Sequence, residues 1–330
     1  MIVGLKTQIL AAGEAAVAAA ARTLAAGGLI AFPTETVYGL GADAANAEAI
    51  ARLYQAKRRP AFNPLISHVS GLAAAQRFAQ FDATALALAD AFWPGPLTLV
   101  LPKTPRCPVA DIATAGLDTV AVRIPAHPLA RAILDAFGGA VVAPSANLSG
   151  HVSPTTAAHV QGDLAGRIDL IVDGGPVQVG VESTIVGCFG APMLLRPGGV
   201  PREAIERVLG RALMASPENP GTDDGQPLAP GMLASHYAPG TRVRLDAASV
   251  EPGEALLAYG PASLPGLDTA AAVMNLSERG DLAEAAANLF SYLRALDAEH
   301  ARAIAVMPVP NDGLGEAIND RLRRAAAPRS

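Results

Sequence analysis

The chain is a succession of short apolar runs separated by helical segments and by glycine or proline. The clearest run is Thr119 to Ile124, TVAVRI, whose residues alternate with a period of two and therefore predict a strand. The segment from Ala47 to Lys57 instead carries apolar residues at helical spacing. Strands that alternate with helices are typical of mixed α/β layers, and we predict that fold class.

The same patterns predict the other elements of the first two thirds of the chain. Strands are expected at Leu29–Phe32, Leu65–Val69, Leu97–Leu101, Ala140–Ala143, Leu170–Asp173 and Met193–Arg196. Helices are expected at Glu14–Ala26, Leu72–Phe78, Asp82–Trp93, Pro128–Phe137 and Pro201–Leu209. The proline-broken segment from Lys103 to Leu117 is expected to be irregular.

With 330 residues the chain is long enough for two domains. Between residues 214 and 240 the composition shifts to proline, glycine, serine and aspartate, which is typical of a linker. We predict a first domain at 1–213, a linker at 214–240 and a small parallel α/β domain at 241–330. The elements expected in this last domain are strands Arg242–Leu245, Ala255–Tyr259 and Ala303–Met307 and helices Leu282–Leu296 and Leu314–Ala325.

Charge and cysteine content narrow the setting. A net charge of −5 argues against a broad nucleic-acid-binding face. Cys107 and Cys188 are far apart and form neither a zinc pattern nor a disulfide framework, so a reducing, cytoplasmic location is expected. No apolar run approaches the roughly 20 residues of a membrane span. Glu14 and Arg22 interrupt the N-terminal alanine run, which therefore predicts a soluble helix and not a signal peptide.

Residues 32–68 combine hydroxyl groups, a glycine pair and a cationic cluster. Gly39 and Gly41 predict a close bend of the backbone. Lys57, Arg58 and Arg59 stand at the end of a predicted helix, next to a proline that stops it. A triphosphate site needs such donors and cations, but a solvated cationic helix end explains the cluster equally well.

Two further features admit a functional and a structural interpretation. The loop from Pro144 to Gly150, PSANLSG, follows a predicted strand, where ligands bind in open α/β sheets. The same residue types dominate plain turns, which favours the structural interpretation. Arg123 shares one face of the TVAVRI strand with Thr119, and a buried arginine needs a partner. The alternative is an edge strand with Arg123 in water.

Other chemical motifs are weak. Gly39 to Ala44, GLGADA, fits the dinucleotide fingerprint G-x-G-x-x-A. Its glycines do not directly follow the strand, and no acidic residue ends the next strand, so the match carries little weight. The six histidines show no metal-ligand spacing, and we predict no protein metal site.

Taken together, the motifs resemble the YrdC-like family. Between about Gly28 and Gly199 the chain holds, in order, FPTETVYGLGADA, the K-x-R of Lys57 and Arg59, NPLISH, WPGPLT, GLDTVAVRIPAHP, APSANLSG, GVESTIV and LLRPG. The LAPGMLASHYAP segment and the small C-terminal domain look like the long, two-domain form of the family, the threonylcarbamoyl-AMP synthases. So many motifs in this order, over most of the chain, are specific to the family.

The resemblance implies a fold and a reaction. The fold is a twisted mixed α/β sheet around a concave, positively charged cavity, followed by a small Rossmann-like α/β domain. The reaction joins L-threonine, bicarbonate and ATP into L-threonylcarbamoyladenylate and pyrophosphate, with Mg²⁺ on the phosphates and few protein ligands. The product supplies the modification of the tRNA adenosine next to the anticodon. The implied partners are downstream tRNA threonylcarbamoyl-transfer proteins, with direct tRNA binding weak or absent.

The resemblance also implies roles for single residues. The catalytic set around the phosphates is Lys57, Arg59, Ser145 and Asn147. The ATP contacts, besides Arg59 and Ser145, are Asn63, Thr119, Ser153, Arg196 and Tyr237. The L-threonine contacts are Thr36, His68, Arg123, Ala143 and Ser183. Tyr237 lies beside His236 in the linker, and we predict that the linker folds over the nucleotide as an active-site lid.

Two functions from other classes stay open at this point. A double-stranded-RNA or tRNA-binding module would suit a positively charged cavity, and filter binding over a salt series would reveal it by a steep slope. The acidic total disfavours that function. A nicotinamide-dependent dehydrogenase would use Gly39 and Gly41, and an absorbance change with NADH without ATP turnover would reveal it.

Overall fold

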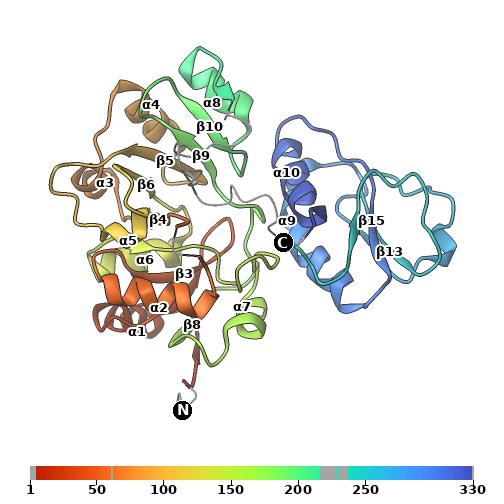
Figure 1. Cartoon of the computed structure of the whole chain (residues 1–330), viewed down its shortest axis with the longest axis horizontal. Helices are drawn as coiled ribbons and strands as arrows, with labels where there is room; N and C mark the ends of the chain where they lie inside the picture. Colours follow the sequence, from red (N-terminus) through yellow and green to blue (C-terminus); the bar gives the residue numbers. More distant parts are fainter. Residues whose placement is uncertain (1–4, 61, 216–228, 230–236, 329–330) are drawn as a thin grey trace.

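The structure, a computed structural model, describes residues 5–60, 62–215, 229 and 237–328 and forms two units, each around its own sheet (Figure 1). The strands of the first unit are β1 (Gln8–Ala11), β2 (Ile30–Pro33), β3 (Tyr38–Asp43), β4 (Ile66–His68), β5 (Leu97–Pro102), β6 (Thr119–Arg123), β7 (Val141–Val142), β8 (Leu170–Asp173), β9 (Thr184–Gly187), β10 (Met193–Arg196) and β11 (Met214–Ala215). Its helices are α1 (Glu14–Ala25), α2 (Ala47–Lys57), α3 (Leu72–Phe78), α4 (Ala83–Phe92), α5 (Asp111–Thr114), α6 (Pro128–Phe137), α7 (Ala157–Leu164) and α8 (Arg202–Leu209).

The second unit is smaller and lies beside the first (Figure 1). Its elements are β12 (Val243–Arg244), β13 (Glu254–Ala258), the 3₁₀ helix η1 (Leu267–Thr269), β14 (Val273–Asn275), α9 (Leu282–Ala298), β15 (Ala303–Val306) and α10 (Gly315–Ala326). Every strand pair in its sheet is parallel, in the order β12-β15-β13-β14. The predicted parallel α/β character of this unit is confirmed.

The sheet of the first unit is mixed and has the order β1-β8-β2-β3-β7-β4-β6-β5-β9-β10-β11. The predicted mixed α/β class is therefore confirmed. Helices α1 and α6 pack together against one part of the sheet through Ala20, Leu24, Ile133 and Leu134, all fully buried. Strands that are far apart in sequence, such as β4 and β6, become neighbours in the middle of the sheet.

The Gly39–Gly41 segment forms part of strand β3, so the predicted backbone bend is wrong. Strand β3 pairs antiparallel with β2, with Phe32 opposite Gly39. A Cβ on Gly41 would lie 2.9 Å from both the Phe32 ring and the Val141 side chain, so packing across the sheet requires glycine there. The G-x-G-x-x-A match is thus not a dinucleotide-binding turn, which removes the reason for expecting a dehydrogenase.

Some elements escaped prediction. Helix α5 interrupts the segment that was expected to be irregular, and α7, β9 and β14 carry no strong periodic signal. The predicted linker and lid, residues 214–240, lie mostly outside the described residues. Its first two residues form β11, which pairs with β10.

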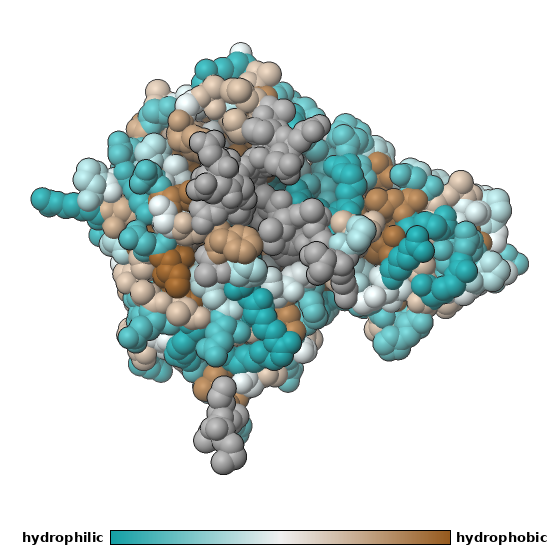
Figure 2. All heavy atoms as spheres, viewed as in Figure 1, coloured by the Kyte–Doolittle hydropathy of each residue, from teal (hydrophilic) through white to brown (hydrophobic). Residues whose placement is uncertain are grey.

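The surface shown in Figure 2 is mostly hydrophilic over both units, with hydrophobic colour in small separate areas. Exposed large hydrophobic residues such as Ile9, Phe62 and Phe189 come from different elements. Among the described residues, no helix is both long and apolar enough to cross a membrane.

Candidate functional site

Arg123 ends a central strand and is buried. Strand β6 lies between β4 and β5, and Arg123 stands directly opposite His68 of β4. The Arg123 side chain is 4% exposed. The alternative of an edge strand with Arg123 in water is therefore wrong, and the guanidinium needs internal partners.

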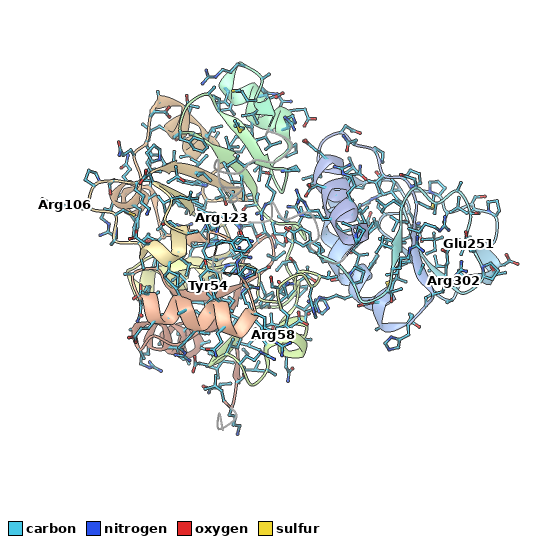
Figure 3. The ribbon with its side chains drawn as sticks, in the orientation of Figure 1. Tyr54, Arg58, Arg106, Arg123, Glu251 and Arg302 are labelled. Atoms are coloured by element: carbon cyan, nitrogen blue, oxygen red, sulfur yellow. The ribbon has the colours of Figure 1, made fainter. Side chains whose placement is uncertain are left out.

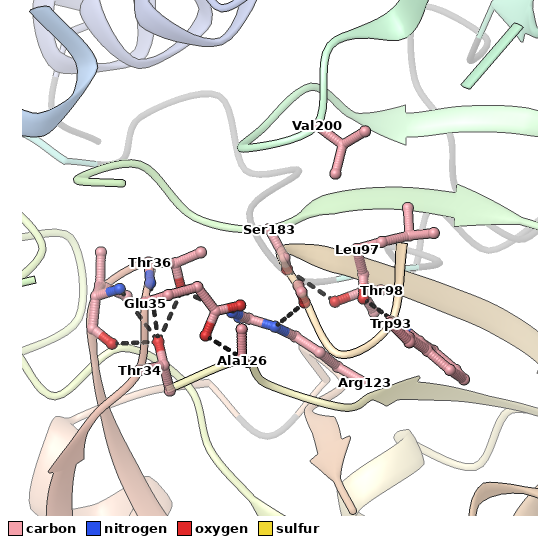
Figure 4. Close-up of polar contacts among 12 residues, drawn as sticks. Thr34, Glu35, Thr36, Trp93, Leu97, Thr98, Arg123, Ala126, Ser183 and Val200 are labelled. Carbon is pink, nitrogen blue, oxygen red and sulfur yellow. Dashed lines mark hydrogen bonds and ion pairs between the residues drawn. The ribbon is translucent and has the colours of Figure 1, made fainter. Parts of the chain in front are cut away.

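The main partner of Arg123 is Glu35, which the sequence analysis did not single out. Arg123 Nη2 donates to Glu35 Oε1 at 2.6 Å, Nη1 donates to Thr36 Oγ1 at 3.0 Å, and Nε donates to the Gly95 carbonyl at 3.2 Å (Figure 4). The other Glu35 oxygen accepts from the Ala126 amide at 3.0 Å. Burial alone would raise the pKa of Glu35, but the Arg123 charge and these hydrogen bonds outweigh burial and hold it below its usual value.

A small cavity of about 50 Å³ lies beside this ion pair. It collects most of the predicted ligand contacts from both the threonine and the ATP sets. Its walls are formed by Thr36, Val37, Arg59, Ile66, His68, Arg123, Ala143, Pro144, Ser145, Glu182, Ser183, Arg196 and Tyr237. This volume is well below the roughly 300–1,000 Å³ of small-molecule pockets, so a ligand of nucleotide size would fit only if parts of this wall moved apart.

Two buried arginines make this cavity attractive to an anion. Arg59 is 8% exposed, and burial lowers its pKa to about 10, so the group stays charged at neutral pH. Arg59 Nη2 donates to the Pro64 carbonyl at 3.2 Å, whereas Nε has no partner among the described residues. No described carboxylate forms an ion pair with Arg59. Arg196 Nη2 donates to the Ser183 carbonyl at 2.8 Å. Buried guanidinium groups in the wall of a cavity are typical of phosphate or carboxylate sites.

Lys57 is buried and does not line the cavity. Its Nζ donates to the carbonyls of Ser145 and Asn147, at 2.5 Å each. Burial, and then the nearby Arg59 charge, lower the pKa of Lys57 well below its usual value. The two bonds tie the end of α2 to the PSANLSG loop, and Asn147 continues the tie by donating to the Leu148 and His151 carbonyls.

Three other predicted ATP contacts also lie outside the cavity wall. Ser153 is fully buried and donates to Glu182 Oε1 at 2.6 Å, so it contacts a residue of the cavity wall without lining the cavity itself. Asn63 is fully buried, and its side-chain amide has no hydrogen-bond partner among the described residues. Thr119 begins β6 while Arg123 ends it, so the two lie about 13 Å apart along the strand. The roles of these residues remain predictions.

His68 is expected to make the folded state less stable in acid. Burial, and then the Arg123 charge, lower the pKa of His68 from 6.5 to about 3. Below about pH 6.5 the unfolded chain binds a proton that the folded chain binds only near pH 3. The free energy of unfolding should therefore fall with falling pH in this window, by at most about 1.4 kcal/mol per pH unit from this group.

Urea unfolding of the wild type and of His68→Gln, measured at several values between about pH 7 and pH 5, tests this expectation. As the pH falls, the free energy of unfolding should decrease less steeply in the glutamine variant than in the wild type. The difference in slope should correspond to about one bound proton. Parallel curves for the two proteins would show that His68 titrates alike in the folded and unfolded chains.

A larger cavity lies elsewhere and contains none of the predicted residues. Its volume is about 710 Å³, and it lies where β3 ends and β7 begins, around Asp43, Arg77, Arg106 and Ala140. Figure 3 places Arg106 at the outer edge of the first unit, whereas Arg123 lies inside it. The smaller cavity is the better candidate for chemistry, because buried cations and hydroxyls converge there.

Comparisons with known proteins identify the family to which the chain is similar. Residues 22–198 match the profile of the Sua5, YciO and YrdC family, described as Telomere recombination. Residues 200–327 match a second profile, described as the C-terminal domain of threonylcarbamoyl-AMP synthase.

Two relatives are similar to this chain over nearly the whole length of both proteins. The chain is 40% identical to a threonylcarbamoyl-AMP synthase of Bacillus subtilis, which covers 98% of this chain and 96% of the relative. It is 42% identical to the Pyrococcus abyssi protein of the same name, with 91% of each chain covered. The solved structure of P. abyssi Sua5 in complex with L-threonine superposes with a TM-score of 0.86 at 38% identity, covering 98% of this chain and 97% of the other.

Proposed function

This chain belongs to the threonylcarbamoyl-AMP synthase family, and on that basis we propose that it forms L-threonylcarbamoyladenylate from L-threonine, bicarbonate and ATP. It is an enzyme of the adenylyl-transferring kind. The observation that carries the proposal is one cavity in which a buried, carboxylate-paired arginine and two further buried arginines meet.

L-Threonine is proposed to bind at Arg123, beside Thr36 and His68. Arginine has five N–H donors, and the bonds to Glu35, Thr36 and the Gly95 carbonyl use three of them. The remaining N–H groups on the terminal nitrogens are available to the threonine carboxylate. Neutral His68 adds no charge next to the threonine amine, because its lowered pKa leaves it unprotonated at neutral pH. The resemblance to P. abyssi Sua5, solved with L-threonine, supports this assignment.

The phosphates are proposed to bind at Arg59, Arg196 and the loop that holds Ser145. The threonine nitrogen first attacks the bicarbonate carbon, which gives a carbamate and releases water. A carbamate oxygen then attacks the α-phosphorus of ATP, and the bond to the bridging oxygen breaks so that pyrophosphate leaves with its electron pair. The protein forms no covalent bond in these steps, so orientation and charge neutralisation by the guanidinium groups supply the catalysis.

Lys57 is proposed to act by holding this loop. Its bonds to two carbonyls fix the backbone that carries Ser145, which faces the cavity. Magnesium is proposed to arrive with ATP and to be held mainly by phosphate oxygens. Glu182 is the carboxylate in the described wall of the cavity, and Arg321 already pairs with it.

The product is proposed to serve tRNA threonylcarbamoyl-transfer proteins in the cytoplasm. A mixed anhydride of a carbamate and a phosphate is labile in water, so the consuming reaction must follow closely. Direct tRNA binding by this chain is expected to be weak or absent, since the net charge is −5.

Pyrophosphate release tests the proposed function. With ATP, Mg²⁺ and bicarbonate present, release should depend on L-threonine and should stop when bicarbonate is removed. L-Valine, which has the same shape but lacks the hydroxyl donor, is the matched control and should support far less turnover. Pyrophosphate release that does not depend on L-threonine would contradict the proposal, and so would an absence of release with all substrates present.

A further inference from the structure

The two units pack closely at the wall of the cavity. Gly180 lies against α9, and a Cβ on it would be 2.2 Å from the Ala286 carbonyl oxygen, so the two backbones meet there without intervening side chains. Val181 and Tyr237 belong to the same apolar cluster as Phe290 and Ile318 of the second unit. The second unit therefore forms part of the support behind the cavity.

Arg321 of α10 is the polar centre of this contact. Its side chain is 0% exposed, and Nε donates to Glu182 Oε2 at 2.8 Å across the boundary between the units. Nη1 donates to its neighbour Asp320 at 2.6 Å. Nη2 forms no hydrogen bond with any described residue. The guanidinium carbon also lies 5.2 Å from the centre of the Tyr237 ring, within range of a cation–π contact.

Glu182 and Tyr237, the two residues of the cavity wall that Arg321 contacts, each make a further contact with another residue. Glu182 accepts from Ser153 through its other oxygen, so the carboxylate joins Arg321 to a predicted ATP contact. The Tyr237 ring stacks on Phe290 of α9 with its centre 5.6 Å from the Phe290 ring centre. Glu182 and Tyr237 both line the cavity, whereas Arg321 does not.

A carboxylate in the wall of a site for a polyanion raises a problem of charge. At an effective dielectric constant of about 20, a single negative charge about 12 Å from a phosphate charge weakens its binding roughly tenfold. Arg321 offsets that charge from outside the cavity, where it leaves the space for ligand free, while Arg324 pairs with Asp320, the second carboxylate on Arg321. The ion pair also fixes the orientation of Glu182 and, through it, of the Ser153 hydroxyl.

We propose that Arg321 is a positioning residue for the adenylation reaction, through which the second unit neutralises Glu182 and holds Tyr237 at the nucleotide side of the cavity. This inference rests on the proposed function. It gives the second unit an indirect part in ATP binding, because a side chain of α10 balances the charge of Glu182 in the cavity wall of the first unit.

The test compares the steady-state KM values for ATP and L-threonine in full-length variants. Arg321→Met should raise the ATP KM about tenfold, the effect of one uncompensated charge, and change the L-threonine KM less than twofold. Arg321→Lys keeps the positive charge, and its ATP KM should lie between those of the wild type and the methionine variant. Arg321→Met/Glu182→Gln removes both charges and should recover an ATP KM within about threefold of the wild type.

Arg202→Met is the matched control. Arg202 also joins the two units by a double hydrogen bond, to Glu316 at 2.5 and 3.2 Å, but neither residue lines the cavity. The Arg202→Met variant should therefore have the same ATP KM as the wild type. If Arg321→Met does not fold, the double variant carries the test, and a tenfold increase in its ATP KM overturns the proposal.

Two other results would overturn the inference. One is an unchanged ATP KM in folded Arg321→Met. The other is an equal increase of the ATP and L-threonine KM values that the double variant does not reverse, since this is the result expected of a purely structural contact. Absence of threonine-dependent turnover in the wild type would instead contradict the proposed function, and ATP affinity measured by calorimetry on the same variants would then decide on Arg321.

Discussion

Arg123→Ala is expected to raise the L-threonine KM by roughly 10- to 100-fold and to leave the ATP KM nearly unchanged, because it removes charge-assisted hydrogen bonds worth about 1.5–3 kcal/mol. The same change should lower the free energy of unfolding by about 3–5 kcal/mol, because it leaves Glu35 buried without its partner. Both effects are expected because Arg123 pairs with Glu35 in the structure and is proposed to bind the substrate carboxylate as well.

Substrate titrations by pyrophosphate release and urea unfolding at neutral pH measure the two effects. Arg52→Ala is the control, because its ion pair with Asp169 has side chains 45% and 28% exposed and should contribute at most about 1 kcal/mol. A parallel rise in both KM values would show that Arg123 only supports the site. Unchanged stability would show that the Glu35 pair does not hold the fold.

Arg59→Met is expected to have the opposite combination of effects. Its ATP KM should rise roughly 10- to 100-fold, because the variant lacks the proposed charge-assisted contact with the phosphates, worth about 1.5–3 kcal/mol. Its free energy of unfolding should stay equal or increase. No described carboxylate pairs with Arg59, and replacing a buried, unpaired cation by an apolar side chain of similar size removes a desolvation penalty.

Arg58→Gln is the matched control for this variant. Arg58 is the preceding residue, is exposed, and caps α2 in the left-handed conformation with a φ of 53°. Its loss should leave the ATP KM within about twofold of the wild type, because exposed charges are screened. ATP binding that is unaffected in Arg59→Met would remove this residue from the phosphate site, and a marked loss of stability would reveal a structural role.

The periodic patterns of the sequence predicted most elements that carry the site. β-Branched residues favour strand β6, which ends at Arg123. Helix α2 begins after Asn46, whose side chain accepts from the Glu48 and Ala49 amides. Strand β3 could not be found this way, because its glycines have weak strand propensity and are required by neighbours across the sheet.

Local propensity and ordered motifs were enough to predict the α/β class, most strands and helices, the family and the residue types that suit an anionic ligand. Which charges form pairs depends on the three-dimensional packing and could not be predicted from these patterns. Arg123 and Glu35 are separated by 88 residues, Lys57 and Asn147 by 90, and Arg321 and Glu182 by 139. Such pairs form because burial makes an unpartnered charge costly, and burial depends on how distant segments pack.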